Sequence, residues 1–157
     1  MTPVTYTVRP ACAADASQLL ALMRELAAFE GYIEQFCVSE EDLLERGLRG
    51  GASPQFSALV AETGKGQLLA YALVYTVPYT FDLRPNLVLK ELYVRESARG
   101  LGIGQALMAA VLNLAKQLGC ARLKWNVLPG NTRAQVFYRS LGGAQDSAWE
   151  AWIKVLP

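Results

Sequence analysis

Apolar and polar residues follow two different spacings along the chain, and these spacings predict where strands and helices lie. A strand places successive side chains on opposite faces, so alternating or β-rich runs bounded by turn residues indicate strands. Six runs of this kind predict strands: Val4–Arg9, Phe56–Glu62, Gln67–Val77, Val88–Val94, Ala121–Val127 and Trp149–Val155. The turn Thr63-Gly64-Lys65-Gly66 joins the second run to the third, which predicts a hairpin.

The first helical spacing follows the first predicted strand. Asp15 is expected to open this helix with Gln18 as its capping-box partner, and Gly31 is expected to end it. Apolar residues three and four positions apart would form its buried face: Leu19, Leu22, Met23, Leu26 and Phe29. We therefore expect an amphipathic helix that packs on the sheet.

Three further helices are predicted downstream. Ser39 with Asp42 indicates a second helix start, and this helix is expected to run to about residue 49. Gln105–Leu118 is apolar on nearly all sides, which predicts a buried helix with Gly119 as its C-cap. Asn131 is expected to cap a short helix that ends before residue 142.

The order of the predicted elements is β-α-α-β-β-β-α-β-α-β, and no linker separates them. This order predicts one α/β domain over residues 1–157, with a mixed central β-sheet flanked by helices. The length of 157 residues suits a single domain, and 52% hydrophobic residues are ample for its core. Only 18% of the residues are charged, which excludes disorder as a description of the whole chain.

Histidine is absent from the chain, and its absence narrows the possible chemistry. It excludes Ser-His-Asp and Cys-His nucleophile systems, and it excludes zinc and haem held by histidine. We therefore expect no metal site. Any acid–base step must use Glu, Asp, Tyr, Lys, Cys or water.

The three cysteines, Cys12, Cys37 and Cys120, lie far apart and form no C-x-x-C pair. An odd number cannot pair fully within one chain, so thiols in a reducing compartment are favoured over a catalytic thiol. The N-terminus lacks the apolar run of a signal peptide, and no run approaches the roughly 20 apolar residues of a membrane span. We expect a cytoplasmic protein without a membrane partner.

The net charge of +1 argues against a dedicated nucleic-acid binder, so no nucleic-acid partner is expected. The charge is nevertheless unevenly distributed. Residues 1–82 carry ten acidic and five basic residues, whereas residues 83–157 carry four acidic and ten basic residues. Solvated helix faces explain most of this pattern. It would also suit a protein that holds a cationic ligand with its first half and an anionic ligand with its second.

Leu92–Gly104 carries the most informative pattern, because a predicted strand passes through a glycine-rich turn into a helix. This arrangement binds phosphates, since N–H groups at the helix start point at the anion and glycine lets the backbone approach it. Arg99 adds a mobile positive charge at the rim. No Lys-Ser or Lys-Thr pair follows, which excludes a Walker A loop, and the late position disfavours a Rossmann fingerprint. Phosphate binding is favoured over a plain flexible turn.

The same turn resembles a known cofactor loop. Arg99-x-x-Gly102-x-Gly104 matches the coenzyme A loop, [QR]-x-x-G-x-[GA], of the GNAT N-acetyltransferase superfamily, which the chain resembles nearly end to end. Asn131-x-x-Ala134-x-x-Phe137-Tyr138 resembles the second cofactor motif of that superfamily. Four further segments resemble its diamine (spermidine/spermine and thialysine) acetyltransferase branch: Glu25-Leu26-Ala27-x-Phe29-Glu30, Asp42-Leu43-Leu44-Glu45, Tyr79-Thr80-Phe81 and Arg99-Gly100-x-Gly102-Ile103-Gly104.

The resemblance implies a GNAT fold, acetyl-CoA as the cofactor and direct transfer of the acetyl group to a primary amine. It also implies a set of cofactor-binding residues: Leu92, Tyr93, Val94, Arg99, Gly100, Leu101, Gly102, Ile103, Gly104, Asn131 and Ala134. A backbone amide of Leu92–Val94 would stabilise charge on the thioester oxygen. The phenol of Tyr138 would protonate the departing thiolate, and the simpler alternative for Tyr138 is packing beside Phe137.

The base is expected on the strand before the turn, where the branch typically has a Glu-Asp pair and this chain has Lys90-Glu91. Strand alternation places Leu87, Leu89, Glu91 and Tyr93 on one face and Lys90 on the other. Three alternatives stay open. Glu91 serves as base or charge anchor, waters alone remove the proton, or the substrate is not a polyamine, because Lys90 would repel one.

Glu30, Tyr79 and Phe81 complete the predicted site. Glu30 resembles a residue that binds the distal ammonium of the substrate, and a solvated carboxylate at a helix end explains it equally well. Tyr79 and Phe81 would wall the amine channel, or they are core aromatics. A small di- or polyamine or an amino-acid-like amine is the expected substrate. A protein or peptide N-acetyltransferase and a non-catalytic acyl-CoA-binding module are the alternatives. By resemblance, a homodimer is expected.

Overall fold

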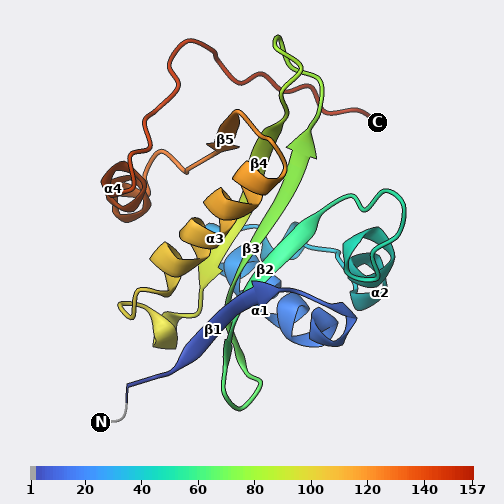
Figure 1. The fold of residues 1–157 in the computed structure, drawn as a ribbon, viewed down its shortest axis with the longest axis vertical. Helices are drawn as coiled ribbons and strands as arrows, with labels where there is room; N and C mark the ends of the chain where they lie inside the picture. The colour runs from blue at the N-terminus through green and yellow to red at the C-terminus, as the bar shows by residue number, and fades with distance from the viewer. Residues whose placement is uncertain (1–2) are drawn as a thin grey trace. The chain divides into compact units, whose positions relative to one another are not determined.

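Five strands form one mixed sheet in the computed structural model, which describes residues 3–157 (Figure 1). The strands are β1 (Tyr6–Pro10), β2 (Ser57–Thr63), β3 (Leu68–Val77), β4 (Asn86–Val94) and β5 (Arg122–Trp125). They lie in the sheet in chain order. β1 to β4 pair antiparallel with their neighbours, and β5 runs parallel to β4. The predicted mixed sheet is therefore confirmed.

Four α-helices accompany the strands in the described residues: α1 (Ala16–Glu30), α2 (Glu40–Leu43), α3 (Ile103–Gln117) and α4 (Thr132–Ser140). The chain divides into two compact units. One unit ends at Trp125 and contains the whole sheet with α1, α2 and α3, and the other is Asn126–Pro157 with α4. Within residues 3–157, no helix combines the length and apolarity that crossing a membrane requires.

Helix α1 packs on one face of the sheet. Its Leu19, Leu22, Met23 and Leu26 form a core cluster with residues of β2, β3 and β4. Phe29, predicted for this buried face, is instead 60% exposed. The prediction for Phe29 is wrong because the helix ends one residue later, at Glu30, and the chain turns away. Gly31 ends the helix as predicted, with a left-handed φ of 84°.

The start of α1 differs from the predicted capping box. A short 3-10 turn over Ala13–Asp15 precedes the helix, and Asp15 there accepts a hydrogen bond from the N–H of Cys12 at 2.8 Å. Gln18 contacts the β2–β3 turn instead. Its side chain accepts from the N–H of Leu68 at 2.8 Å and donates to the carbonyl of Gly66 at 2.9 Å. The prediction that pairs Asp15 with Gln18 is wrong, because a tertiary contact takes the Gln18 side chain.

Ser39 and Asp42 cap α2 as predicted. The Ser39 hydroxyl accepts from the N–H of Asp42, and the Asp42 carboxylate accepts from the N–H of Ser39. The helix continues as a π-helical turn over Leu44–Leu48. A Cβ added at Gly47 would lie 2.5 Å from the Phe56 ring, so glycine is required for this close approach.

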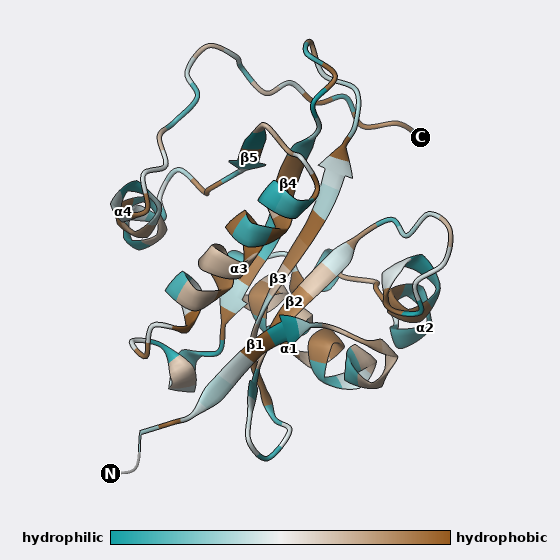
Figure 2. Ribbon diagram, in the orientation of Figure 1, coloured by the Kyte–Doolittle hydropathy of each residue, from teal (hydrophilic) through white to brown (hydrophobic). Residues whose placement is uncertain are grey.

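Helix α3 crosses one face of the sheet (Figure 1). Its buried side consists of five residues: Ile103, Leu107, Met108, Val111 and Ala115. Leu112 and Leu118 are exposed, and the colouring of the helix alternates between hydrophobic and hydrophilic (Figure 2). The prediction of a helix buried on all sides is therefore wrong, because only one side meets the strands. The turn after the helix uses Gly119, whose φ is 70°.

The last predicted strand, Trp149–Val155, is absent from the described chain, which has no helix or strand after Ser140. Trp149, Trp152, Ile153 and Val155 are all strongly exposed. Alternation makes a segment able to form a strand, but a strand also needs a neighbouring strand to accept its hydrogen bonds. The order of elements therefore ends at α4, and this part of the prediction is wrong.

Candidate active site

The glycine turn before α3 adopts a conformation that requires glycine. Gly100 and Gly102 have φ values of 81° and 78°, and Gly102 is the N-cap of α3. A Cβ built at Gly100 would meet nothing within 4 Å, so packing does not explain this glycine. The backbone conformation does, and the open space lets a ligand approach the main chain closely.

The start of α3 presents the donors that such a ligand needs. The N–H of Ala106 donates the first helical hydrogen bond, to the carbonyl of Gly102. The N–H groups that precede Ala106 in the first turn, including those of Ile103 and Gly104, have no carbonyl within the helix to pair with. Leu101 is exposed beside them, and Ile103 is buried and anchors the turn. These residues fit a pyrophosphate held by backbone donors and the helix dipole.

Arg99 is held more firmly than a mobile residue at the rim. Its Nε donates to the carbonyl of Val94 at 3.0 Å. Its guanidinium carbon lies 5.3 Å from the ring centroid of Phe29 and 5.7 Å from that of Tyr93. In this structure the two rings and the Val94 carbonyl hold the side chain beside the turn.

Strand β4 contains a β-bulge at the predicted base. In its ladder with β3, Leu73 pairs with Glu91 and Val74 pairs with Leu89, so Lys90 is the extra residue. A bulge bends its strand and re-aims the side chains that follow it. Lys90 itself is exposed.

Simple alternation would place Leu87, Leu89, Glu91 and Tyr93 on one face of the sheet, but the bulge divides them between two faces. Tyr93 belongs to the core cluster beneath α1, and Glu91 shares its face. Leu87 and Leu89 precede the bulge and lie on the opposite face, with their side chains buried. The prediction of one shared face for all four residues is wrong, because Lys90 shifts the alternation by one position.

Glu91 lies in a largely buried polar environment. The hydroxyl of Tyr71, on β3, donates to Glu91 Oε2 at 2.7 Å, and Tyr71 is 0% exposed. Burial is the main cause that raises the pKa of Glu91. The Tyr71 hydrogen bond and the charge of Lys90 oppose this rise, while the charge of Glu30 adds to it. Glu91 and Glu30 are therefore close enough to interact, as the predicted site requires.

Tyr32, just after the end of α1, joins this group although the sequence analysis did not single it out. Burial raises the pKa of Tyr32 to about 12, with further contributions from the charges of Glu91 and Glu30. Nothing in the spacing of the sequence points to Tyr32, because it lies outside any motif. The group of Glu30, Tyr32, Tyr71 and Glu91, here called the carboxylate cluster, comes from α1, the turn after it, β3 and β4.

A second network ties α1 to the end of β4. Arg95 and Glu25 form a salt bridge at 2.8 Å, and the hydroxyl of Tyr93 donates to Glu25 at 3.3 Å. The side chain of Tyr93 thus contacts Glu25 of α1, and its backbone pairs with Tyr71 on β3. The ladder between β4 and β5 ends at the pair Leu89–Trp125, so Leu92 and its neighbours have no β5 partner within the described ladder.

Tyr79 and Phe81 do not join the carboxylate cluster. They are 84% and 90% exposed, in the loop that follows the last β3–β4 pair, Val77 with Asn86. Phe81 lies under the guanidinium of Arg122, with 4.5 Å between that carbon and the ring centroid. Glu91 pairs four residues earlier along β3, which corresponds to about 13 Å of strand. The expectation of core aromatics is also wrong for this pair.

The unit Asn126–Pro157 holds the second predicted cofactor motif. The side chain of Asn131 accepts a hydrogen bond from the N–H of Ala134 at 3.1 Å and so caps α4 as predicted. The ring of Tyr138 packs edge-on against that of Phe137, with 5.3 Å between the centroids. This contact is the packing expected of a helix aromatic. The role of Tyr138 as proton donor to the leaving thiolate stays a prediction.

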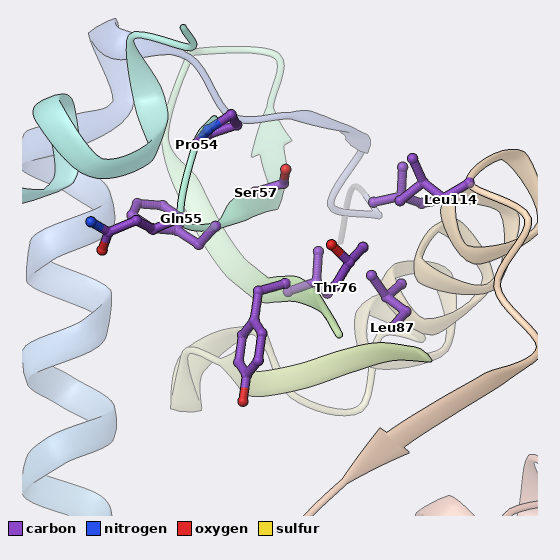
Figure 3. A pocket seen from close by; sticks show the side chains of 10 residues that line it. Pro54, Gln55, Ser57, Thr76, Leu87 and Leu114 are labelled. Atoms are coloured by element: carbon purple, nitrogen blue, oxygen red, sulfur yellow. The ribbon is translucent and has the colours of Figure 1, made fainter. Parts of the chain in front are cut away.

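A hollow of about 290 Å³ lies at the other end of α3 (Figure 3). Leu114 of α3 and Leu118, just after the helix, line it, together with Ser57, Thr76 and Leu87 of the sheet. The glycine turn lies at the start of α3, about 20 Å away along a helix of 15 residues. This hollow is therefore separate from the glycine turn.

Known proteins resemble this chain in sequence and in fold. The profile of the acetyltransferase (GNAT) family matches residues 19–142. The thialysine N-epsilon-acetyltransferase of Bos taurus is 35% identical over 152 residues, which cover 92% of this chain and 88% of that protein. The spermidine/spermine N(1)-acetyltransferase-like protein 1 of Homo sapiens is 29% identical over 94% of this chain and 22% of that protein. A solved structure of a probable acetyltransferase has a TM-score of 0.81 at 21% identity, covering 96% of this chain and 98% of its own.

The match over residues 19–142 includes the glycine turn and the start of α4, which carry the predicted cofactor motifs. It confirms the resemblance to this superfamily, and the two named relatives agree with the diamine and thialysine branch. The chain belongs to the acetyltransferase (GNAT) family and is an N-acetyltransferase that uses acetyl-CoA.

Proposed function

We propose that this enzyme acetylates the primary amine of a small cationic substrate, a di- or polyamine or an amino-acid-like amine. The carboxylate cluster carries the proposal: Glu91 is largely buried, and Glu30 is close enough to interact with it. The partly dehydrated carboxylate of Glu91, with the exposed carboxylate of Glu30 near it, attracts an ammonium group. The relative from Bos taurus is named for acetylation at the N-epsilon position of thialysine, which also supports a primary amine.

Glu91 acts in this proposal as the proton acceptor, directly or through water. A primary amine with a pKa near ~10.4 is mostly protonated at neutral pH and must lose a proton before it attacks. Burial raises the pKa of Glu91, which makes its carboxylate a stronger base than an exposed one. Lys90 is exposed at the bulge, and its side chain does not take the buried position of Glu91.

Acetyl-CoA supplies a thioester that is activated toward amines. In the proposal, the backbone of Arg99–Gly104 binds its pyrophosphate, and Asn131 and Ala134 bind along the pantetheine arm. Backbone N–H groups of Leu92–Val94 donate to the thioester oxygen. The hydroxyl of Tyr138 delivers a proton to the leaving sulfur. The single domain over residues 1–157, the homodimer and the cytoplasmic location remain proposals alongside these roles.

The test is the release of coenzyme A thiol from acetyl-CoA at mildly alkaline pH across a panel of amines. The panel contains spermidine, short diamines, thialysine, free amino acids, an aminoglycoside and a basic peptide. Turnover with di- or polyamines, or with thialysine, is the expected result. Turnover only with the peptide would replace the proposal by protein or peptide acetylation. Protein that binds acetyl-CoA and turns over no amine would contradict a catalytic role.

A further inference from the structure

We infer that Tyr71 is a positioning residue that holds the Glu91 carboxylate in place and keeps it ionised for proton transfer. The inference rests on the proposed function, because it assigns Tyr71 a role through Glu91. Tyr71 touches neither substrate nor cofactor in this scheme. It acts only through its hydrogen bond, in which its hydroxyl donates to Glu91 Oε2 at 2.7 Å.

The position of the Tyr71 hydroxyl is set by packing on all sides. The residue is 0% exposed and belongs to the core cluster beneath α1. Its backbone pairs with Tyr93 across the β3–β4 ladder, and the two rings lie 6.4 Å apart at an angle of 53°. A phenol anchored in this way offers its hydroxyl at one fixed place, so Glu91 gains a partner that does not need to be ordered during the reaction.

The bulge is what brings the two residues together. Leu73 pairs with Glu91, and Tyr71 lies two residues before Leu73 on the same face of β3. Leu89 lies on the face of the sheet away from α1. Without the extra residue Lys90, strict alternation would place Glu91 on that face as well. The hydrogen bond therefore depends on the irregularity of β4, and an unbroken strand would not form it.

The charges around Glu91 explain why it needs this partner. Glu30, at the end of α1, adds negative charge, and Lys90, beside it on β4, adds positive charge. Tyr32 interacts with both carboxylates from the turn after α1. The pKa of Tyr71 is raised strongly by burial and by the charge of Glu91, so its hydroxyl stays protonated and remains a donor. Donation to the ionised carboxylate favours the charged form, against the effect of burial.

Tyr71→Phe tests the inference, because it removes the hydroxyl and keeps the ring. Losing a donor to the ionised form raises the pKa of Glu91. The acidic limb of kcat/KM against pH is therefore expected to move to higher pH, with roughly a tenfold loss at any pH on that limb and none on the alkaline plateau. Acetyl-CoA affinity, measured by calorimetry, should not change.

Tyr75→Phe is the matched control, since it removes a hydroxyl from the same strand at a residue with no part in the cluster. It should leave the pH profile unchanged. A direct titration of the Glu91 carboxyl carbon by NMR, in wild type and Tyr71→Phe without substrate, should show the same upward shift and needs no activity.

The outcomes distinguish the inference about Tyr71 from the proposed role of Glu91. An unshifted profile and an unshifted titration in Tyr71→Phe would overturn the inference, and so would a uniform loss of rate at every pH. Full activity in Glu91→Gln would overturn the role of Glu91 in the proposed function, whatever the Tyr71 titration shows. A shifted titration with an inactive Glu91→Gln variant supports both.

Discussion

The glycine turn closely follows β4, which carries Glu91 of the carboxylate cluster, yet different forces shape the turn and the cluster. The turn depends on the backbone conformations of Gly100 and Gly102 and on the start of the helix that follows. The carboxylate cluster gathers side chains from α1, the turn after it, β3 and β4. The conformation of the turn therefore depends on residues that are close together in the sequence. The cluster exists only when the β3–β4 register is correct.

This difference has a chemical consequence. Backbone N–H groups bind an anion without help from particular side chains, so the proposed cofactor binding should tolerate many substitutions around the turn. Proton transfer needs one carboxylate at one position with a suitable pKa. Substitutions in the two regions should therefore separate acetyl-CoA binding from turnover.

Glu91→Gln is expected to cause the largest loss, about a hundredfold or more in kcat, because it removes the proposed proton acceptor. Acetyl-CoA affinity should stay within error of wild type. The matched control is Lys90→Gln at the neighbouring exposed position, where only a small change is expected. Steady-state kinetics with the preferred amine, together with calorimetry, make the measurement. Equal losses of kcat in both variants would contradict a specific role for the Glu91 carboxylate in proton transfer.

Gly102→Asp should weaken acetyl-CoA binding by about 30-fold. A φ of 78° strains a residue that carries a side chain, and the added carboxylate repels a phosphate. Gly119→Asp is the control, because Gly119 has a φ of 70° at the opposite end of the same helix. Calorimetry with acetyl-CoA should detect a loss in the first variant alone. Unchanged affinity in Gly102→Asp would remove the turn from cofactor binding.

Tyr138→Phe tests the one proposed catalytic group outside the sheet unit. If its hydroxyl protonates the leaving thiolate, kcat should fall by about tenfold with little change in acetyl-CoA affinity. A stopped assay at saturating substrates, paired with calorimetry, is the measurement. Wild-type turnover would remove Tyr138 from the proposed mechanism.

Asp15→Asn should change stability and leave catalysis almost untouched. Hydrogen bonds from Arg9, at 2.7 and 2.8 Å, lower the pKa of Asp15 to about 2 from its usual 3.8. A lowered carboxyl pKa stabilises the fold above the unfolded value, and that stabilisation is lost as the pH falls through 3.8 toward 2. The variant should lose about 2 kcal/mol of unfolding free energy at neutral pH.

Denaturant unfolding at several pH values measures this effect. The difference between wild type and Asp15→Asn should close as the pH approaches 2. A difference that stays constant with pH would mean that packing, rather than charge, accounts for the loss. Unchanged kcat in the same protein would confirm that this network lies outside both regions compared above.

Part of the fold and of the site is predictable from short stretches of sequence. The β2–β3 hairpin, the Ser39–Asp42 cap and the Asn131 cap all depend on residues a few positions apart, and all three are confirmed. The strand predicted at Val4–Arg9 begins at Tyr6, because only from there does β2 offer a partner. Local signals therefore identify elements better than they identify the ends of elements.

The errors share a cause, which is that a partner distant in sequence decided the outcome. Gln18 could cap a helix, but it binds the β2–β3 turn instead. Trp149–Val155 has strand-like alternation and no strand partner in the described chain. Tyr79 and Phe81 have the pattern of core aromatics, yet their loop lies beyond the end of the β3–β4 ladder and both are exposed.

Short stretches of sequence were enough to predict the mixed α/β fold, the family and the glycine turn, because periodicity, glycine conformations and helix starts act over a few residues. Only the tertiary structure decided that Lys90 bulges out of β4, that Glu91 faces α1 and that Tyr71 donates to it. The register of two strands depends on the packing of both faces at once, and a single inserted residue reverses every side chain beyond it. The position of Glu91 on the α1 face and its hydrogen bond from Tyr71 follow from that one shift.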